Sequence, residues 1–563
     1  MSNAREVFTL KRFSLFIICI AIFAFAFSSQ ACAADVSQLR GPRIEKLLML
    51  IISDPDAQVM AAEAGDVDLA SDITRPSDID RLGTNPNLRM SLARGMHAFF
   101  LLLNNNVAPW NDPAVRRAAA MSIDRSSIVR MIFSGYCEPI NSWLPPVSPW
   151  ALSDAARDIY DPEGAAALLE SAGYGHDISG MLTMPDGTRF PEMKLLTPLA
   201  RVAPTTAELA EIMADSLRAA GFPVEVEPMD FSAMIARLDR KDYSLAVLAW
   251  GMGRDPDSLY SFYHSEMDVE GGYNMTGVHD ERLDAALYAL RHAPDKAAAK
   301  TASDAAQRLL LEIMPSIPIY SRISVAAISD KWKNIFTTER MTADNMWTLI
   351  AAEPVDGTMR PFRMIIAEEP RNLNPFTASS AYSWQVLGMI YESLLTTDPN
   401  TLEDMPALAE SWEIRTVHEG GDHTELTFRI KDGLRWSDGS PLSARDVAAT
   451  INFIHEKRIP RFFDAVKDVV SVMAIDSHTV KVVMSGVSYW YLGNIGGLPT
   501  LPRAVIEKIT DWQRWDPLAD SETGGPLGLV GCGPFMLESY RPGEYVMMKR
   551  NPYYRLLPKG IAR

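Results

Sequence analysis

The order of predicted strands and helices in the middle of the sequence constrains the fold most. Strands are predicted over residues 194–197, 224–227 and 243–250, and helices over 206–220 and 230–238. A β-α-β-α-β order of this kind predicts a parallel sheet with right-handed crossovers. The chain is therefore expected to have an α/β fold.

Start and stop signals indicate further helices. Residues 113–134 and 162–173 are each predicted to be helical, because each follows an Asp-Pro pair and ends at or next to a glycine. Residues 280–313 form a long helical region rich in Ala and Leu, with a break near Pro294.

Residues 406–500 follow a different pattern. A strand is predicted over 425–431, a helix over 443–456, and a hairpin from 469–475 and 479–484. This predicts a smaller α+β domain inserted in the larger architecture.

The first 34 residues have the pattern of a secretory signal. A positively charged start precedes an apolar run over 13–27 and then small residues. The run has about 15 residues, fewer than the roughly 20 that span a membrane. We expect cleavage near Ala33 or Ala34, with an uncleaved anchor or a lipoprotein cysteine at Cys32 as alternatives.

Charge and cysteine content exclude several classes. The 563 residues include 54 Lys and Arg against 71 Asp and Glu, a formal charge of −17. This disfavours non-specific binding to nucleic acid or anionic membranes. Only 4 cysteines occur, which excludes a disulfide scaffold and a multi-cysteine metal cluster. Beyond the signal, Cys137 and Cys532 could pair, but two free buried cysteines are expected.

Catalytic motifs were sought and not found. The sequence has no phosphate-binding P-loop, HExxH, CxxC or GxSxG motif, and its histidines are scattered. Neighbouring carboxylates such as Asp255 and Asp257 are explained by turns and helix caps. We therefore expect a protein that is not an enzyme, with no catalytic residues, no metal site and no cofactor.

A set of short segments extends over nearly all of residues 40–560. In the first half they are AGDVD (64–68), NDPAVRRA (111–118), IDR (123–125) and LLESAGY (168–174). In the second half they are LNP (373–375), YESLL (391–395), PALAESW (406–412), FRIKDGLRWSDGSPL (428–442), GCGPF (531–535) and RNPYY (550–554). Together they resemble the family 5 extracellular solute-binding proteins, the peptide/nickel class that serves ABC importers.

The order of these segments is not the order of the family. In the family, the segment at 373–375 comes early, and the segment at 550–554 leads directly into the segment at 64–68. Here the two halves are exchanged, and residues 351–361 would join the family's end to its beginning. The pattern predicts a circular permutation, with two accidentally fused gene fragments as the alternative.

The resemblance implies a two-lobe, periplasmic-binding-protein-like fold of type II, in the class with an extra small α+β domain, here circularly permuted. The expected divisions are a signal peptide (1–34), lobe I in three parts (36–105, 321–405 with the linker 351–361, and 501–563), a closing lobe III (106–320) and a small domain II (406–500).

The loop after the strand at 243–250 is the first candidate ligand site. Ligands bind outside the carboxyl ends of strands in an open α/β sheet. Gly251 and Gly253 would let a ligand approach the backbone, and Trp250 and Met252 suit an apolar or ring-bearing group.

The resemblance implies that this loop lines the ligand cleft. Oligopeptide-binding members carry an aspartate there for the peptide's amino terminus, and Gly253 stands at that position. A buried ammonium without a partner costs several kcal/mol. The ligand would therefore lack a free α-amine or use Asp255 or Asp257. Arg254 could bind a carboxylate or phosphate, or merely pair with Asp255.

The resemblance also implies further candidate ligand-binding residues, and for each the alternative role is core packing or a turn. They are Asn104 and Asn106 near the expected hinge, Tyr382 and Trp384 from lobe I, Tyr489 from the small domain, and Cys532 in a further cleft loop.

The implied function is a periplasmic solute-binding protein of an ABC importer. It would capture a peptide or peptide-like small molecule in an interlobe cleft and deliver it to an inner-membrane ABC permease. We expect a monomer that binds no nucleic acid. The alternatives are a secreted α/β hydrolase, or a ligand sensor with the same fold that docks to a membrane receptor.

Overall fold

The computed structural model describes residues 36–154, 159–201, 203–269, 272–418, 421–519 and 529–558. The predicted signal peptide lies outside these residues. Within them, no helix has the length and apolar character needed to cross a membrane.

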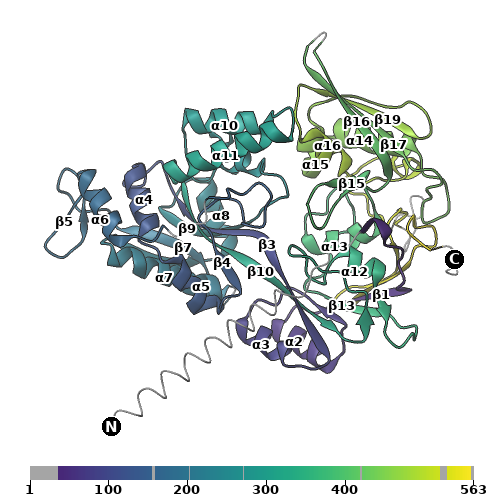
Figure 1. The fold of residues 1–563 in the computed structure, drawn as a ribbon, viewed down its shortest axis with the longest axis horizontal. Helices are drawn as coiled ribbons and strands as arrows, with labels where there is room; N and C mark the ends of the chain where they lie inside the picture. The colour runs from purple at the N-terminus through teal and green to yellow at the C-terminus, as the bar shows by residue number, and fades with distance from the viewer. Residues whose placement is uncertain are drawn as a thin grey trace.

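One eleven-stranded mixed sheet runs through the molecule (Figure 1). Along the sheet the strands are β20 (Phe535–Arg541), β21 (Tyr545–Arg550), β1 (Lys46–Ile51), β13 (Phe362–Ile366), β2 (Leu69–Ala70), β10 (Ser316–Ser329), β3 (Leu88–Leu103), β9 (Leu245–Gly251), β7 (Met193–Pro198) and β8 (Val224–Met229), with β4 (Cys137–Pro139) also paired to β10.

Two bodies are visible in Figure 1, and the long strands β3 and β10 pass from one to the other. These strands pair antiparallel from Leu88↔Ser329 to Leu102↔Ser316, with register shifts near Tyr320. Each body has its own hydrophobic core. The first core draws almost all its residues from Ala98 to Tyr320, and the second from residues before and after that stretch.

The first body contains the predicted β-α-β-α-β unit. Strands β7, β8 and β9 are joined by α7 (Pro204–Ala219) and α8 (Phe231–Asp239), and β7 pairs parallel with both β8 and β9. The α/β prediction is confirmed.

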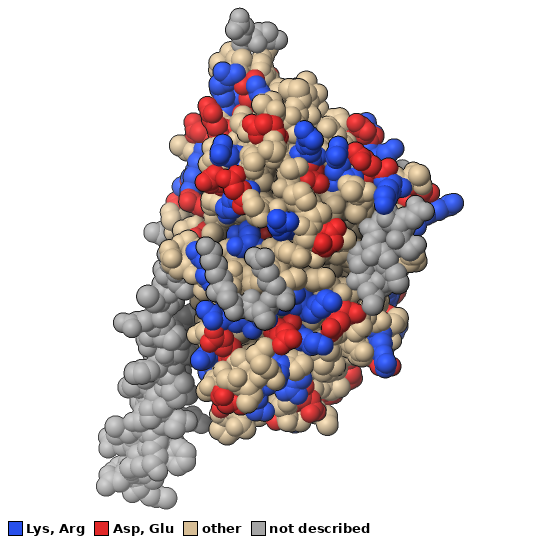
Figure 2. All heavy atoms as spheres, turned by 90° about the vertical axis from the view of Figure 1, so that its right-hand side faces the viewer, with Lys and Arg blue, Asp and Glu red and all other residues tan. Residues whose placement is uncertain are grey.

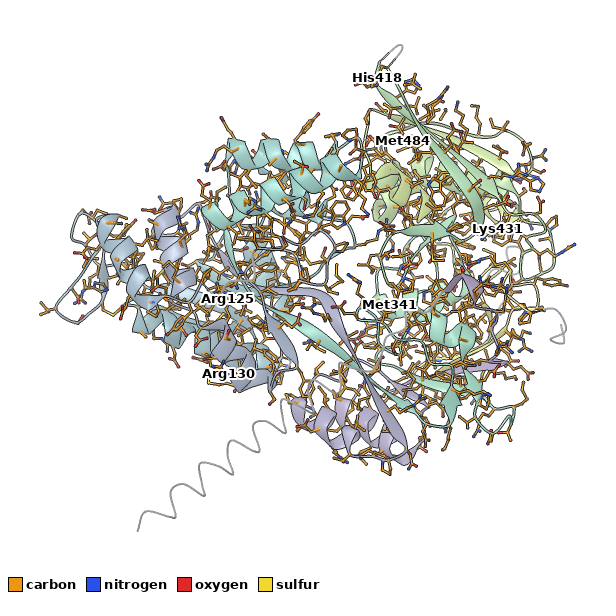
Figure 3. The ribbon with its side chains drawn as sticks, in the orientation of Figure 1. Arg125, Arg130, Met341, His418, Lys431 and Met484 are labelled. Carbon is orange, nitrogen blue, oxygen red and sulfur yellow. The ribbon has the colours of Figure 1, made fainter. Side chains whose placement is uncertain are left out.

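The prediction of one continuous helix over 113–134 is wrong. The structure has α4 (Pro113–Met121) and α5 (Arg125–Phe133), because the Asp124 carboxylate accepts the Ser127 amide and starts a new helix. Arg125, labelled in Figure 3, lies inside the first body and donates from Nε to the Pro318 carbonyl at 2.7 Å, which ties α5 to β10.

The other predicted helices are confirmed. The structure has α6 (Pro162–Ser171), followed by Gly173 in the left-handed region, and the pair α10 (Glu281–Arg291) and α11 (Lys296–Ile313) on either side of Pro294.

A separate four-stranded sheet forms the upper part of the second body in Figure 1. Its order is β16 (Ala409–Val417), β17 (His423–Ile430), β19 (Thr479–Ser485) and β18 (Val469–Ala474), and α14 (Ala444–Lys457) packs against it. The predicted strand, helix and hairpin of this α+β region are confirmed. The outer face of the second body mixes charges of both signs (Figure 2).

The remaining elements are short helices and strands. They are η1 (Val36–Gln38), α2 (Pro55–Ala64), α3 (Pro76–Gly83), β5 (Gly175–His176), β6 (Leu182–Thr183), α9 (Ser258–Tyr263), η2 (Ser265–Met267), β11 (Trp332–Lys333), α12 (Met346–Ala351), β12 (Glu353–Pro354), α13 (Ala381–Ile390), β14 (Leu395–Thr397), β15 (Asp404–Pro406), α15 (Pro460–Val466), α16 (Tyr491–Gly496) and α17 (Arg503–Ile506).

The two ends of the described chain lie side by side. The Gly41 amide donates to the Leu556 carbonyl at 2.9 Å, and Val36 shares a buried cluster with Tyr554. Strands β1 and β21 are also direct neighbours in the main sheet.

Candidate ligand site

The candidate loop begins where β9 ends, beside β3. Gly251 pairs with His97 across these strands, and a side chain on Gly251 would meet the His97 ring at 3.8 Å. Desolvation and the charge of Arg322 lower the pKa of His97. Sequence reasoning missed His97, because its place opposite Gly251 follows from strand pairing alone.

The apolar residues of the loop have different roles. Trp250 stacks on Phe262 with ring centroids 4.6 Å apart, and it meets the exposed Tyr273 edge-on. Trp250 therefore contributes to a partly open aromatic wall. Met252 instead packs in the first core, and its amide donates to the Met96 carbonyl at 2.7 Å, whereas its ligand contact stays a prediction.

Gly253 leaves space above the loop. A side chain at this position would meet nothing closer than the Asp255 backbone at 3.9 Å. Packing does not require glycine here, and the missing carboxylate is a chemical difference rather than a steric one.

Arg254 joins the two bodies. Its Nε lies 3.2 Å from Oδ1 of Asp255, and its Nη1 lies 2.6 Å from Oδ1 of Asp404 in β15. The pairing with Asp255 was the alternative expected from the sequence, whereas Asp404 was not anticipated. Burial raises the pKa of Asp255, against the opposing effect of Arg254.

The Asp257 carboxylate forms an ion pair with Arg291. Both its oxygens accept hydrogen bonds from Arg291, at 3.0 and 2.9 Å, and the Arg291 guanidinium lies 3.6 Å above the Tyr260 ring. Asp257 is therefore already paired with a cation, which makes it a weaker candidate partner for a ligand amine.

A cavity of about 220 Å³ lies between the two bodies at this point. It is bordered by α11, the loop after β9, the turn between β14 and β15, and the start of α16. In Figure 1, α11 of the first body faces α16 and β15 of the second. The lining residues are Pro149, Trp150, Arg254, Asp255, Lys296, Lys300, Thr401, Leu402, Glu403, Asp404, Tyr489, Trp490 and Gly493.

Residues 488–490 of the second body dock on α10 and its C-terminal end. The Tyr489 amide donates to the Ala293 carbonyl at 2.6 Å, and Trp490 Nε1 donates to the Leu290 carbonyl at 2.9 Å. Lys296 also pairs with Glu403 across the same boundary. These contacts bring Tyr489 into the cavity of Arg254 and Asp255.

Two predicted site residues are buried in the fold and do not line this cavity. Asn104 is fully buried, and its amide donates to the carbonyls of Lys241 and Tyr243 at 2.9 and 2.8 Å. Cys532 is 4% exposed within the second core, because the glycines beside it pack against the end of α13.

Three more predicted residues lie away from the Arg254 cavity. Asn106 lines a different cavity of about 530 Å³ beside α4. Tyr382 and Trp384 lie on α13, where the Trp384 indole donates to the Ala378 carbonyl and Arg461 covers its ring at 4.5 Å.

The two cysteines beyond the predicted signal peptide lie in different cores. Cys137 and Cys532 are both free and buried, as expected. Burial raises the pKa of Cys137 to about 12. Among the described residues, no three His, Cys, Asp or Glu side chains are grouped to hold a metal ion.

Two bodies that share strands and enclose a cavity between them are typical of a ligand-binding protein. The chain matches the family of bacterial extracellular solute-binding proteins, family 5 Middle, over residues 37–268 and 404–560. It belongs to this family.

Individual relatives match in part. The chain is 27% identical over 290 residues to di/tripeptide-binding protein 2 of Pseudomonas aeruginosa (strain UCBPP-PA14), covering 51% of this chain and 52% of that protein. It is 26% identical over 273 residues to the nickel-binding periplasmic protein of Escherichia coli (strain K12), covering 44% and 50%. The chain thus spans about half the length of the curated relatives it matches.

Solved structures match over similar shares. The oligopeptide-binding protein AppA from Bacillus subtilis, in complex with a nonapeptide, is 19% identical with a TM-score of 0.46, covering 54% of this chain and 59% of that one. NikA from Brucella suis in complex with Fe(III)-EDTA is 22% identical with the same TM-score, covering 54% and 61%.

Proposed function

We propose that this protein is the substrate-binding component of an ABC importer. It captures a peptide-like small molecule between its two bodies and delivers it to a permease in the inner membrane. The observation that carries the proposal is the cavity at the loop after β9, which both bodies line. Membership of a family of solute-binding proteins supports binding without catalysis.

Export and a monomeric state complete this proposal. Residues 1–34 direct the chain to the periplasm and are removed during export. The mature protein is a monomer and binds no nucleic acid. Amino-terminal sequencing of periplasmic protein tests export, because a sequence starting at Met1 would contradict cleavage.

The expected ligand differs from a plain oligopeptide. Gly253 supplies no carboxylate, and Asp257 is paired with Arg291 and does not line the cavity. The carboxylates of the lining are Asp255, Asp404 and Glu403, and Glu403 pairs with Lys296. Arg254 is already bound by Asp255 and Asp404, which weakens its expected role as a receptor for an anionic group.

Mass spectrometry of ligand released from natively purified protein tests the function directly. We expect one class of small molecule in near-stoichiometric amount. Small-angle scattering should show a smaller radius of gyration when that molecule is added back to stripped protein. Catalytic turnover of peptides or esters, or the absence of both ligand and closure, would contradict the proposal.

A further inference from the structure

Two carboxylates share one guanidinium inside the cavity. Asp404 accepts from Arg254 at 2.6 Å, and Asp255 accepts at 3.2 and 3.4 Å. The side chains of Arg254, Asp404 and Asp255 are 21%, 18% and 30% exposed, so water screens them only partly. This inner cluster therefore has a formal charge of −1.

The other two cations of the cavity do not offset that charge. Lys296 pairs with Glu403, and Lys300 pairs with Asp304 on the same helix. Their side chains are 57% and 39% exposed, which places them toward solvent. Each forms a locally neutral pair.

One carboxylate oxygen of the cluster is unused. Oδ2 of Asp404 accepts no hydrogen bond from any residue that the structure describes, whereas Oδ1 holds Arg254. A carboxylate can accept several hydrogen bonds at once. Asp404 can therefore hold Arg254 and receive a second donor.

Three aromatic rings form one wall of the cavity. The centroids of Trp150, Tyr489 and Trp490 lie 5.0 to 6.3 Å from one another, with interplanar angles of 63° to 76°. Rings tilted in this way present faces in different directions, and the face of an aromatic ring attracts a cation.

Size restricts the ligand further. The cavity of about 220 Å³ is smaller than the range of about 300 to 1,000 Å³ that accommodates drug-sized ligands. It suits a compact molecule or a single group, and it is too small for an extended peptide.

We propose that this cavity binds a compact organic cation, an alkylammonium or alkylguanidinium group, held by Asp404 and Asp255 and covered by the three aromatic rings. The cation brings the inner cluster to neutrality and donates to the free Asp404 oxygen. The inference rests on the proposed capture of a ligand between the two bodies, and it names the chemical class of that ligand.

Calorimetry with butylguanidinium and its neutral isostere butylurea tests the inference. We expect butylguanidinium to bind and butylurea to bind at least ten-fold more weakly, since only the cation gains charge-assisted hydrogen bonds. Asp404→Asn should weaken butylguanidinium binding by about ten-fold. Asp464→Asn is the matched control, because that side chain is 96% exposed outside the cavity.

The outcomes distinguish failure of the proposed ligand class from failure of the proposed ligand capture. Equal binding of the two probes, or cation binding unchanged in both Asp404→Asn and Asp255→Asn, would overturn the cation assignment. A neutral or anionic molecule released from the native protein would do the same while leaving ligand capture intact. Circular dichroism of each variant checks folding, and Asp255→Asn replaces Asp404→Asn if the latter does not fold.

Discussion

At the scale of single residues, Gly253 leaves room for one more carboxylate at an exposed position of the loop after β9. The space above it accepts a side chain, so Gly253→Asp should fold normally. The new carboxylate would lie at an exposed position, where an ion pair with a ligand ammonium contributes about 0.2–1 kcal/mol. We expect the variant to gain affinity for plain dipeptides by up to about five-fold in calorimetry. Gly253→Asn, of the same size but uncharged, is the control and should gain nothing.

Gly493 determines where Arg254 can lie. A side chain at position 493 would approach Arg254 Nη2 to 2.5 Å, so Gly493→Ala should push the guanidinium away from Asp404. Because the displaced atom is the end of a flexible side chain, we expect a loss of at most about 1 kcal/mol in the free energy of unfolding, together with weaker ligand binding. Urea denaturation measures the first effect. Gly388→Ala is the control, because a side chain there meets nothing within 4 Å, and it should not be destabilising.

The sequence predicted only the local part of this site. Arg254 and Asp255 follow a recognisable strand, so their shared loop was predictable. Trp250 lies within that strand and does not line the cavity. Asp404 comes from a hairpin far along the chain, and its contact with Arg254 depends on how the two bodies meet. No spacing or periodicity in the sequence encodes that contact.

At the scale of elements, predictions succeeded where the signals are local. The predicted helices and strands between 193 and 251 and between 423 and 485 follow from caps, glycines and alternating apolar residues, whereas β16 and α15 were not predicted. The helix over 113–134 failed because Asp124 starts a second helix through its own side chain, a signal that competes with a continuous apolar pattern.

The strands that connect the bodies depend on a close approach at Gly95. A side chain there would lie 2.4 Å from the Arg322 carbonyl, at the register shift in the pairing of β3 and β10. Gly95→Ala should therefore lower the free energy of unfolding by about 1–3 kcal/mol in urea titrations. Gly83→Ala, whose nearest neighbour would be a flexible Met90 side chain at 3.8 Å, should have little effect. Equal stability of the two variants would contradict the importance of this approach.

At the scale of the whole molecule, we propose that the chain is a circular permutation of its family. An alignment that preserves order can follow only one of two exchanged halves, which accounts for matches covering 51% of this chain and 52% of a relative. The hydrogen bond between Gly41 and Leu556 shows that the segments joined in the family order are neighbours here.

A gene rebuilt in the family order, residues 363–560 followed by 40–350, tests the permutation. The contacts would stay the same and only short loop closures would change, so we expect stability within about 1 kcal/mol. Thermal and urea unfolding provide the comparison. An insoluble rebuilt protein beside a well-folded native one would refute the proposal.

The contact between Trp150 and Trp490 across the two bodies also has an optical consequence. Their rings lie 5.2 Å apart and each side chain is only 5% exposed, so separation of the bodies would move two indoles from an apolar environment into water. Indole emission shifts to longer wavelength with solvent polarity, and the protein therefore contains its own fluorescent reporter of opening. Opening and ligand exchange could therefore be followed in real time without an attached dye. Trp490→Phe would remove one of the two indoles that report opening.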